Sequence, residues 1–255
     1  MNILTLKLIL APIIIGGTSL AGRRWGPEVS GWLVGMPLTS GPVLFFLALS
    51  HGSVFTASTA LGTLSGGLSL VAFCLSYSWL AMRSKWPLAL TGSFLCFSAI
   101  TLLMQTLILP LAWIFMLVVL AVLAGLWLMP NGRTLEASEI QPGRWDIPGR
   151  ILIGTAFILA LTGIAPLIGP RLTGLLATIP LYTTILAVFA HRLQGAPGAI
   201  NVLRGLLMGL FSFAGFFLVA ALLIGSTGIA ITFLSAITTA LVIQGISLLR
   251  IRKSA

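Results

Sequence analysis

Long apolar runs separated by short polar stretches make up almost the whole chain. A helix that crosses a bilayer needs roughly 20 predominantly apolar residues. The run at 87–129 is too long for one crossing, so we place a break near Gln105 to Pro110. The pattern then predicts nine membrane-spanning helices at 3–21, 31–49, 54–82, 87–105, 108–129, 150–168, 172–190, 199–224 and 228–249.

Composition agrees with this pattern. Of the 255 residues, 58% are hydrophobic and 7% are charged, whereas a soluble domain carries about 25% charged residues. The sequence therefore predicts an all-α integral membrane protein. The net charge of +10 would suggest nucleic acid in a soluble protein, but here the basic residues lie in short loops between apolar runs, where they set topology.

The basic residues also test the number of helices. With nine spans, one side of the membrane carries Lys7 and Arg171. Arg204 lies just inside a span on the opposite side. Cytoplasmic loops carry the excess of Lys and Arg, so the bias predicts an outer N-terminus and a cytoplasmic C-terminus. The opposite side collects Arg23, Arg24, Arg83, Lys85, Arg133, Arg144, Arg150, Arg192, Arg250, Arg252 and Lys253.

Two parts of the chain repeat each other at a spacing of 143 residues. Segments 26–73 and 169–216 align without a gap, and 13 of the 48 aligned positions are identical. The glycine and proline matches carry most weight, because these residues fix backbone geometry. The matched glycines and prolines are Gly26, Pro27, Gly31, Pro37, Gly52, Gly62 and Gly66 with Gly169, Pro170, Gly174, Pro180, Gly195, Gly205 and Gly209.

This spacing predicts how the chain is divided. Residues 1–106 form a first repeat, 107–149 a connecting helix with a cytoplasmic linker, and 150–255 a second repeat. Because the connecting helix makes the number of spans per period odd, the second four-helix repeat would be inverted in the membrane. Two inverted repeats are an architecture that many transporters share.

The second repeat also resembles a known family. Its features are Gly174 before the Pro180 hydroxyl stretch, Ala190-His191, a loop at Gly195, Leu203-Arg204, and a helix with Gly209, Ser212 and Phe216. Over residues 174–219 these features resemble the GlpM family of small bacterial inner-membrane proteins.

Members of that family are one repeat long and look like dual-topology proteins that pair antiparallel. The resemblance implies that this chain is a fused relative of such a pair. The first repeat departs from the pattern, with Ala48 in place of the histidine and Leu61 in place of the arginine. A looser likeness is to the drug/metabolite transporter superfamily.

The acidic residues limit the chemistry. Glu28, Glu136, Glu139 and Asp146 all fall in predicted loops, so no predicted span contains a carboxylate. Proton- or sodium-coupled export of cations usually needs a carboxylate at membrane depth. No cluster of His, Cys and acidic residues has metal-ligand spacing. We therefore expect no enzyme activity, no catalytic residues, no metal and no cofactor.

The candidate site lies where proline interrupts two predicted spans. Proline removes a backbone donor and frees a carbonyl, and unwound backbone survives at membrane depth only where protein or water satisfies it. Two such breaks related by inversion would meet near the midplane and hold a neutral or anionic ligand. The alternative is that the prolines only kink the helices and the hydroxyls bond to backbone carbonyls. The predicted substrate-binding residues are Pro37, Thr39, Ser40, Gly41, Pro180, Tyr182, Thr183, Thr184 and Arg204.

Together these features predict a transporter of a small neutral or anionic solute in the bacterial inner membrane. Its expected partners are the solute and the lipid bilayer, with no nucleic acid, and pairing of two copies as a homodimer stays open. A channel of the same fold is the near alternative. A membrane scaffold or assembly subunit that transports nothing is the alternative from another class.

Overall fold

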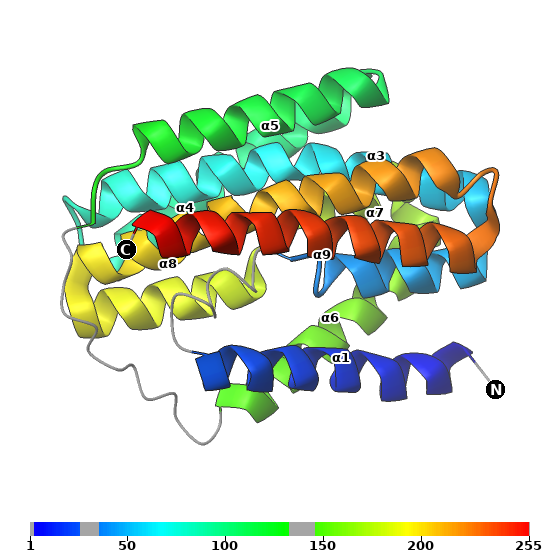
Figure 1. Cartoon of the computed structure of the whole chain (residues 1–255), viewed down its shortest axis with the longest axis horizontal. Coiled ribbons are helices and arrows are strands. Elements are labelled where there is room, and N and C mark those ends of the chain that lie inside the picture. Colours follow the sequence, from blue (N-terminus) through cyan, green and yellow to red (C-terminus); the bar gives the residue numbers. More distant parts are fainter. Residues whose placement is uncertain (1–2, 26–35, 133–145, 255) are drawn as a thin grey trace.

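The computed structural model describes residues 3–25, 36–132 and 146–254 (Figure 1). Within these ranges every regular element is a helix, which confirms the predicted all-α class. The helices are α1 (Ile3–Trp25), α3 (Ser40–Ala81), α4 (Trp86–Thr106), α5 (Leu111–Leu128), α6 (Asp146–Ile168), α7 (Pro170–Leu176), α8 (Leu181–Leu223) and α9 (Gly228–Ser254).

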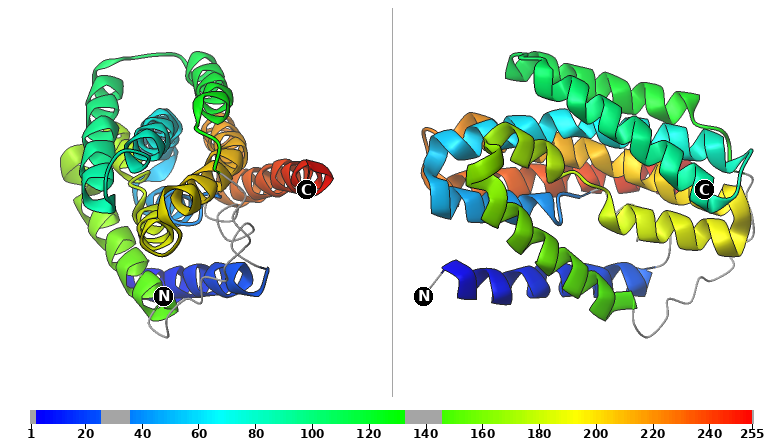
Figure 2. Two further views of the ribbon diagram at one scale, coloured as in Figure 1. Left: turned by 90° about the vertical axis from the view of Figure 1, so that its left-hand side faces the viewer. Right: turned by 180° about the vertical axis from the view of Figure 1, so that it is seen from behind.

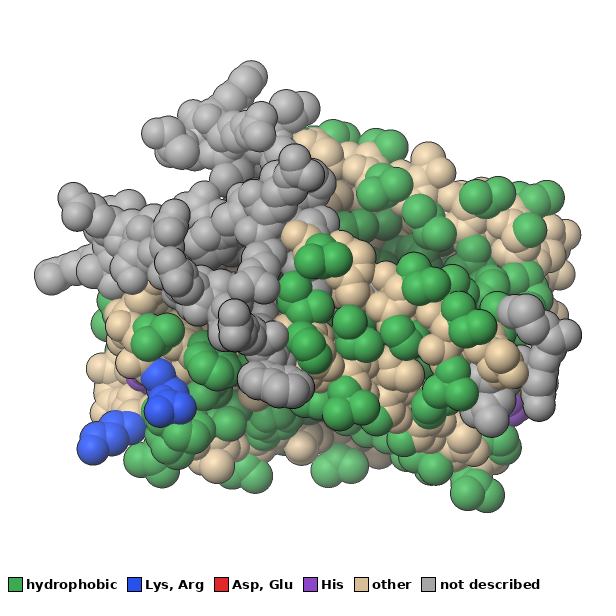
Figure 3. Space-filling model, turned by 90° about the horizontal axis from the view of Figure 1, so that it is seen from below, with side chains coloured by type: hydrophobic (Ala, Val, Ile, Leu, Met, Phe, Trp, Pro, Cys, Tyr) green, Lys and Arg blue, Asp and Glu red, His purple; other side chains and the backbone are tan. Residues whose placement is uncertain are grey.

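Six helical stretches of the described residues are long and apolar enough to cross a membrane. They are α3, α4, α5, most of α6, the stretch from α7 to the end of α8, and residues 228–246 of α9. Large apolar side chains such as Trp113, Leu120 and Trp127 of α5 are exposed, as they would be toward lipid. Figure 3 shows a face dominated by hydrophobic side chains, with Lys and Arg at one end. These are the properties of a multi-pass membrane protein.

Two of the helices are bent sharply at a single glycine. α3 has a non-helical residue at Gly52, with φ 77° and ψ −178°, and α8 has one at Gly195, with φ 72° and ψ −165°. Positive φ with ψ near 180° is a conformation that essentially only glycine adopts. We call residues 40–51 and 53–81 the short and long arms of α3, and residues 181–194 and 196–223 the short and long arms of α8.

The helix boundaries repeat at the same spacing as the sequence. Adding 143 to the bounds of α1 (3–25) gives the bounds of α6 (146–168). When 143 is added to the bounds of α3, the result lies within two residues of the bounds of α8. When 143 is added to the first residue of α4, the result lies within one residue of the start of α9. Gly52 and Gly195 are also 143 residues apart. α5 has no counterpart at this spacing.

The corresponding helices run in opposite directions (Figures 1 and 2). The short arm of α3 (blue) begins near the middle of the long axis and runs to one end, where the long arm turns back. The short arm of α8 (yellow-green to yellow) begins near the same place and runs to the other end. α1 and α6 lie against each other and also run in opposite senses.

Two apolar clusters hold these helices together. The larger cluster joins the long arms of α3 and α8 to α4, α5 and α9, with Phe73, Tyr77 and Phe217 fully or almost fully buried. The smaller one joins α1, α6 and the short arm of α3, and it includes Phe46 and Ile158. α7 packs on the long arm of α3, and α5 packs on both α3 and α8.

Glycine lets α3 and α7 approach closely. A Cβ at Gly62 would collide with the Arg171 carbonyl oxygen, and one at Gly66 would collide with the Thr178 side chain. On the facing helix, a Cβ at Gly174 would collide with the backbone of Thr59.

The elements differ from the predicted spans in detail. The predicted spans at 31–49 and 54–82 correspond to the two arms of α3, although residues 26–35 lie outside the described part of the chain. The predicted span at 172–190 is interrupted, with α7 before the break and the short arm of α8 after it. α6 begins at Asp146, before the predicted start of its span at residue 150, and residues 133–145 lie outside the described part of the chain.

Candidate functional site

The first helix break lies at Pro37, immediately before α3. The amide of Leu38 donates to the carbonyl oxygen of Met36 at 2.7 Å, which closes a three-residue turn around the proline. The amide of Gly41 then donates to the Pro37 carbonyl at 2.9 Å and starts the helix. Thr39 occupies the N-cap position, but its side chain makes no capping hydrogen bond.

The second break repeats this geometry at Pro180. The amide of Leu181 donates to the Ile179 carbonyl at 2.8 Å, and the amide of Thr184 donates to the Pro180 carbonyl at 2.8 Å. Pro180 has φ −80° and ψ 59°, which is an inverse γ-turn. Proline suits this position because its fixed φ matches the turn and its missing N–H is not needed there.

Both breaks leave the amino end of a helix without a side-chain cap. The first amides of an α-helix have no acceptor within the helix, and neither Thr39 nor Pro180 caps its helix through a side chain. These ends carry a partial positive charge. Because the two short arms start near the middle of the molecule and run apart, their amino ends lie in the same region (Figures 1 and 2).

Two of the hydroxyl side chains at the breaks are buried, whereas those of Thr39 and Thr184 are half-buried. Ser40 and Thr183 are each 3% exposed. Gly41 lies against Phe216 of the long arm of α8, where an added Cβ would be 3.6 Å from the ring. The hydroxyl oxygen of Thr184 is buried and has no hydrogen-bond partner among the described residues.

Tyr182 points in a different direction from this group. Its side chain packs against the smaller apolar cluster. A Cβ added to Gly154 of α6 would collide with the tyrosine hydroxyl and would also contact Ile15 of α1. Tyr182 therefore links the second break to the α1–α6 pair.

Arg204 is placed by other contacts. Its guanidinium donates to the carbonyl oxygens of Met129 at 3.3 Å and Pro130 at 3.4 Å, and to Oδ1 of Asn131 at 3.4 Å. These acceptors follow the last turn of α5, where a cation also interacts favourably with the helix dipole. Arg204 thus holds the end of α5, and no recorded hydrogen bond joins it to a residue of either break.

Most other hydroxyls in the spans bond to their own helix. Thr59, Thr63 and Ser65 donate to carbonyl oxygens four residues earlier, at 2.9 Å each. Ser69 instead accepts a hydrogen bond from Thr101 of α4 at 2.9 Å. These hydroxyls fit the alternative in which span hydroxyls only bond to backbone carbonyls or to neighbouring helices. They differ from Thr39, whose side chain does not cap its helix, and from Thr184, whose hydroxyl has no partner among the described residues.

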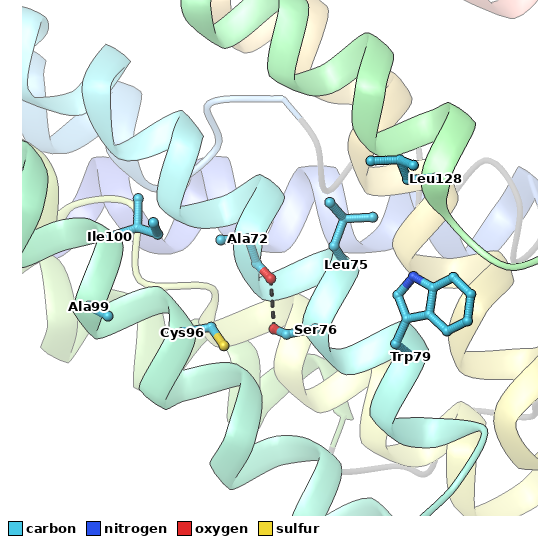
Figure 4. Close-up of a pocket in the computed structure, with 8 residues that line it drawn as sticks. All are labelled: Ala72, Leu75, Ser76, Trp79, Cys96, Ala99, Ile100 and Leu128. Carbon is cyan, nitrogen blue, oxygen red and sulfur yellow. Dashed lines mark hydrogen bonds between the residues drawn. The ribbon is translucent and has the colours of Figure 1, made fainter.

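The structure also shows an apolar pocket, open to the surface, away from the breaks. It has a volume of about 510 Å³ and lies between α3, α4 and the end of α5 (Figure 4). Its lining residues are Ala72, Leu75, Ser76, Trp79, Cys96, Ala99, Ile100 and Leu128, none of which was predicted to bind solute. The only polar side-chain bond drawn there runs from Ser76 to the Ala72 carbonyl at 2.6 Å.

Three polar contacts between helices were not expected from the sequence. Lys7 of α1 donates to Thr162 of α6 at 2.8 Å. The hydroxyl of Tyr77 lies 3.4 Å from Nδ1 of His191, which the structure places inside α8. Arg171 donates to the carbonyl oxygen of Met104 at 2.8 Å. The sequence does show Lys7 as a basic residue within an apolar run, which could have marked it as a residue of interest. Its hydrogen-bond partner could not be predicted, because that depends on how the helices pack.

The described residues contain no group of three or more His, Cys, Asp or Glu that could hold a metal ion. No protein-family model, curated protein or solved structure matches the chain. The site is therefore interpreted from its own geometry.

Proposed function

We propose that this protein carries a small neutral or anionic solute across the bacterial inner membrane. The observation that carries the proposal is the pair of proline turns, at which two helices of opposite direction begin near the middle of the molecule. Interrupted helices with exposed amino ends form the substrate sites of several transporter folds. Non-helical backbone at membrane depth is tolerated only where it is buried in protein or lines a water-filled cavity.

In this proposal the chain has nine spans and two inverted four-helix repeats. The shared spacing of 143 in α1 and α6, in the two proline turns and in the two glycine bends supports such a duplication. The opposite directions of the corresponding helices support the inversion. The charge bias then orients the N-terminus outward and the C-terminus toward the cytoplasm, and the fused GlpM-like pair is the evolutionary form of the same proposal.

The solute site comprises the amino ends of both short arms. Backbone amides of the first helical turn would donate to the solute, with the hydroxyls of Thr39, Ser40, Thr183 and Thr184 around them. Ser40 and Thr183 are almost completely buried, so a solute would reach their hydroxyls only after the neighbouring helices move. Rocking of one repeat against the other would open it alternately to the two sides.

The test replaces one hydroxyl in each repeat. Thr39→Val, Thr183→Val and the double variant would be reconstituted in vesicles and screened with glycerol, acetate and phosphate. A net hydrogen bond contributes about 0.5–1.5 kcal/mol, so each single variant should weaken solute affinity roughly two- to tenfold. The double variant should lose more.

The matched control is Thr91→Val, because Thr91 is exposed on α4 and bonds to the Pro87 carbonyl of its own helix. It should transport as the parent does. If the three break variants insert stably and move a transported solute at the parent rate, the hydroxyls are structural and the proposal fails. Flux that rises linearly with concentration, without saturation or counterflow, would favour a channel.

A further inference from the structure

Lys7 lies where α1, α6 and the short arm of α3 meet. Its ammonium donates to the hydroxyl of Thr162 at 2.8 Å and lies 5.8 Å from the centre of the Phe46 ring. Thr162 is 4% exposed and Phe46 is fully buried. The ammonium is therefore held against two interior side chains from two other helices.

This charge is only partly compensated. The Thr162 hydroxyl donates to the Ile158 carbonyl at 2.7 Å, so toward Lys7 it acts as an acceptor. A single hydroxyl satisfies one of the three ammonium donors, and an aromatic face adds a modest cation–π attraction. No carboxylate pairs with Lys7 among the described side chains. In the proposed nine-span arrangement α1 crosses the membrane, and ionisable residues inside membrane spans are rare and mark pathways of substrates or ions.

Lys7 also contacts the helix that begins at the first break. Phe46 is six residues from Ser40 along the short arm of α3, which is about 9 Å at 1.5 Å per residue. An anion entering from the end where α1 begins would meet the ammonium first. It would then reach the amino end of α3, which also favours negative charge.

We infer that Lys7 selects the charge of the solute, and that the solute carries a carboxylate or phosphate group. This rests on the proposed function and narrows it, since that function allowed neutral solutes as well. Lys7 and the α3 amino end then act in series, the first attracting the oxyanion and the second receiving it. The structural alternative is a lysine that extends its ammonium toward the lipid headgroups. In that case the stability of the protein should not depend on small anions.

The test measures anion binding without transport. The melting temperature of the purified protein, in uncharged and lipid-free detergent, would be recorded with sodium phosphate or sodium acetate against sodium chloride of equal ionic strength. We expect at least one of the two oxyanions to raise it by about 2–4 °C in the parent and in Lys7→Arg. Lys7→Gln should lose the rise, and Thr162→Val should reduce it.

Lys85→Gln is the matched control, because Lys85 is exposed in the turn before α4; it should respond as the parent does. The inference is overturned if neither oxyanion stabilises the parent, or if Lys7→Gln responds as strongly. Phosphatidylglycerol is a separate arm. If it alone stabilises the protein through Lys7, the site holds a lipid headgroup, and the inference about the solute is again overturned.

These outcomes separate the inference from the proposed function. If the Thr39 and Thr183 variants impair transport while the anion response ignores Lys7, transport stands and charge selection by Lys7 is wrong. If the anion response depends on Lys7 but no solute moves, the anion site stands and transport is wrong.

Discussion

At the scale of single residues, small side chains decide which helices can touch. Gly62 and Gly66 of α3 face α7 and the turn after it, and Gly174 of α7 faces α3. Each glycine lies so close to the opposite backbone or side chain that a methyl group has no room. This contact brings the segment before the second break against the long arm of α3. The position of Pro180 therefore depends on it.

Gly174→Ala should destabilise the protein. Its Cβ would collide with the backbone of Thr59 and Thr63, so the two helices would have to move apart. Overpacking of this kind typically costs about 1–3 kcal/mol, and we expect a fall of several degrees in the melting temperature in detergent. Gly163→Ala is the control, because it is exposed on α6 with no atom within 4 Å of the added Cβ. It should be neutral or stabilising; an equal loss in both variants would contradict the close approach.

At the scale of elements, the bends at Gly52 and Gly195 convert two long helices into four arms. Each short arm is too short to cross a membrane of about 30 Å, and each begins at a proline turn. The two short arms therefore begin near the middle of the long axis of the molecule (Figure 1). The bend of α3 and the bend of α8 lie at opposite ends of the molecule (Figure 1).

Replacing either bend glycine should have the same effect, because the two have nearly the same backbone geometry. Gly52→Ala and Gly195→Ala force a side chain into a region that only glycine populates readily, at a cost on the order of 1–3 kcal/mol each. Thermal unfolding would measure the loss, with Gly245→Ala as the control, since Gly245 is exposed on α9 with open space around it. A melting temperature unchanged in both bend variants would show that these joints are not as described.

At the scale of the whole molecule, the sequence predicted the parts better than their assembly. The apolar runs predicted the helical class, and the matched prolines and glycines predicted where the backbone departs from a helix. These are local properties, set by missing amides and by allowed dihedral angles. The short loops expected at Gly52 and Gly195 are instead single residues, because one glycine with positive φ is enough to turn the chain.

Long-range contacts could not be predicted in this way. Arg204 bonds to the end of α5, and Lys7 bonds to Thr162 across 155 positions of sequence. Such partners depend on which helices lie next to each other in the folded protein. The hydrophobic runs in the sequence do not specify this. The role of each hydroxyl was also ambiguous from the sequence. A threonine in a span can bond to a carbonyl of its own helix, as Thr63 does, or stand at the start of a helix without capping it, as Thr39 does.

The central claim is that both helix breaks meet in a site that water and solute can reach. The most direct measurement is the reaction of Thr39→Cys and Thr183→Cys with a small water-soluble methanethiosulfonate reagent, in a chain whose Cys74 and Cys96 are replaced by alanine. We predict that both positions react and that a transported solute slows both reactions. Leu102→Cys, on the exposed face of α4, should not react. If Thr39→Cys and Thr183→Cys stay as unreactive as Leu102→Cys from either side of the membrane, the breaks are closed kinks and the account is wrong.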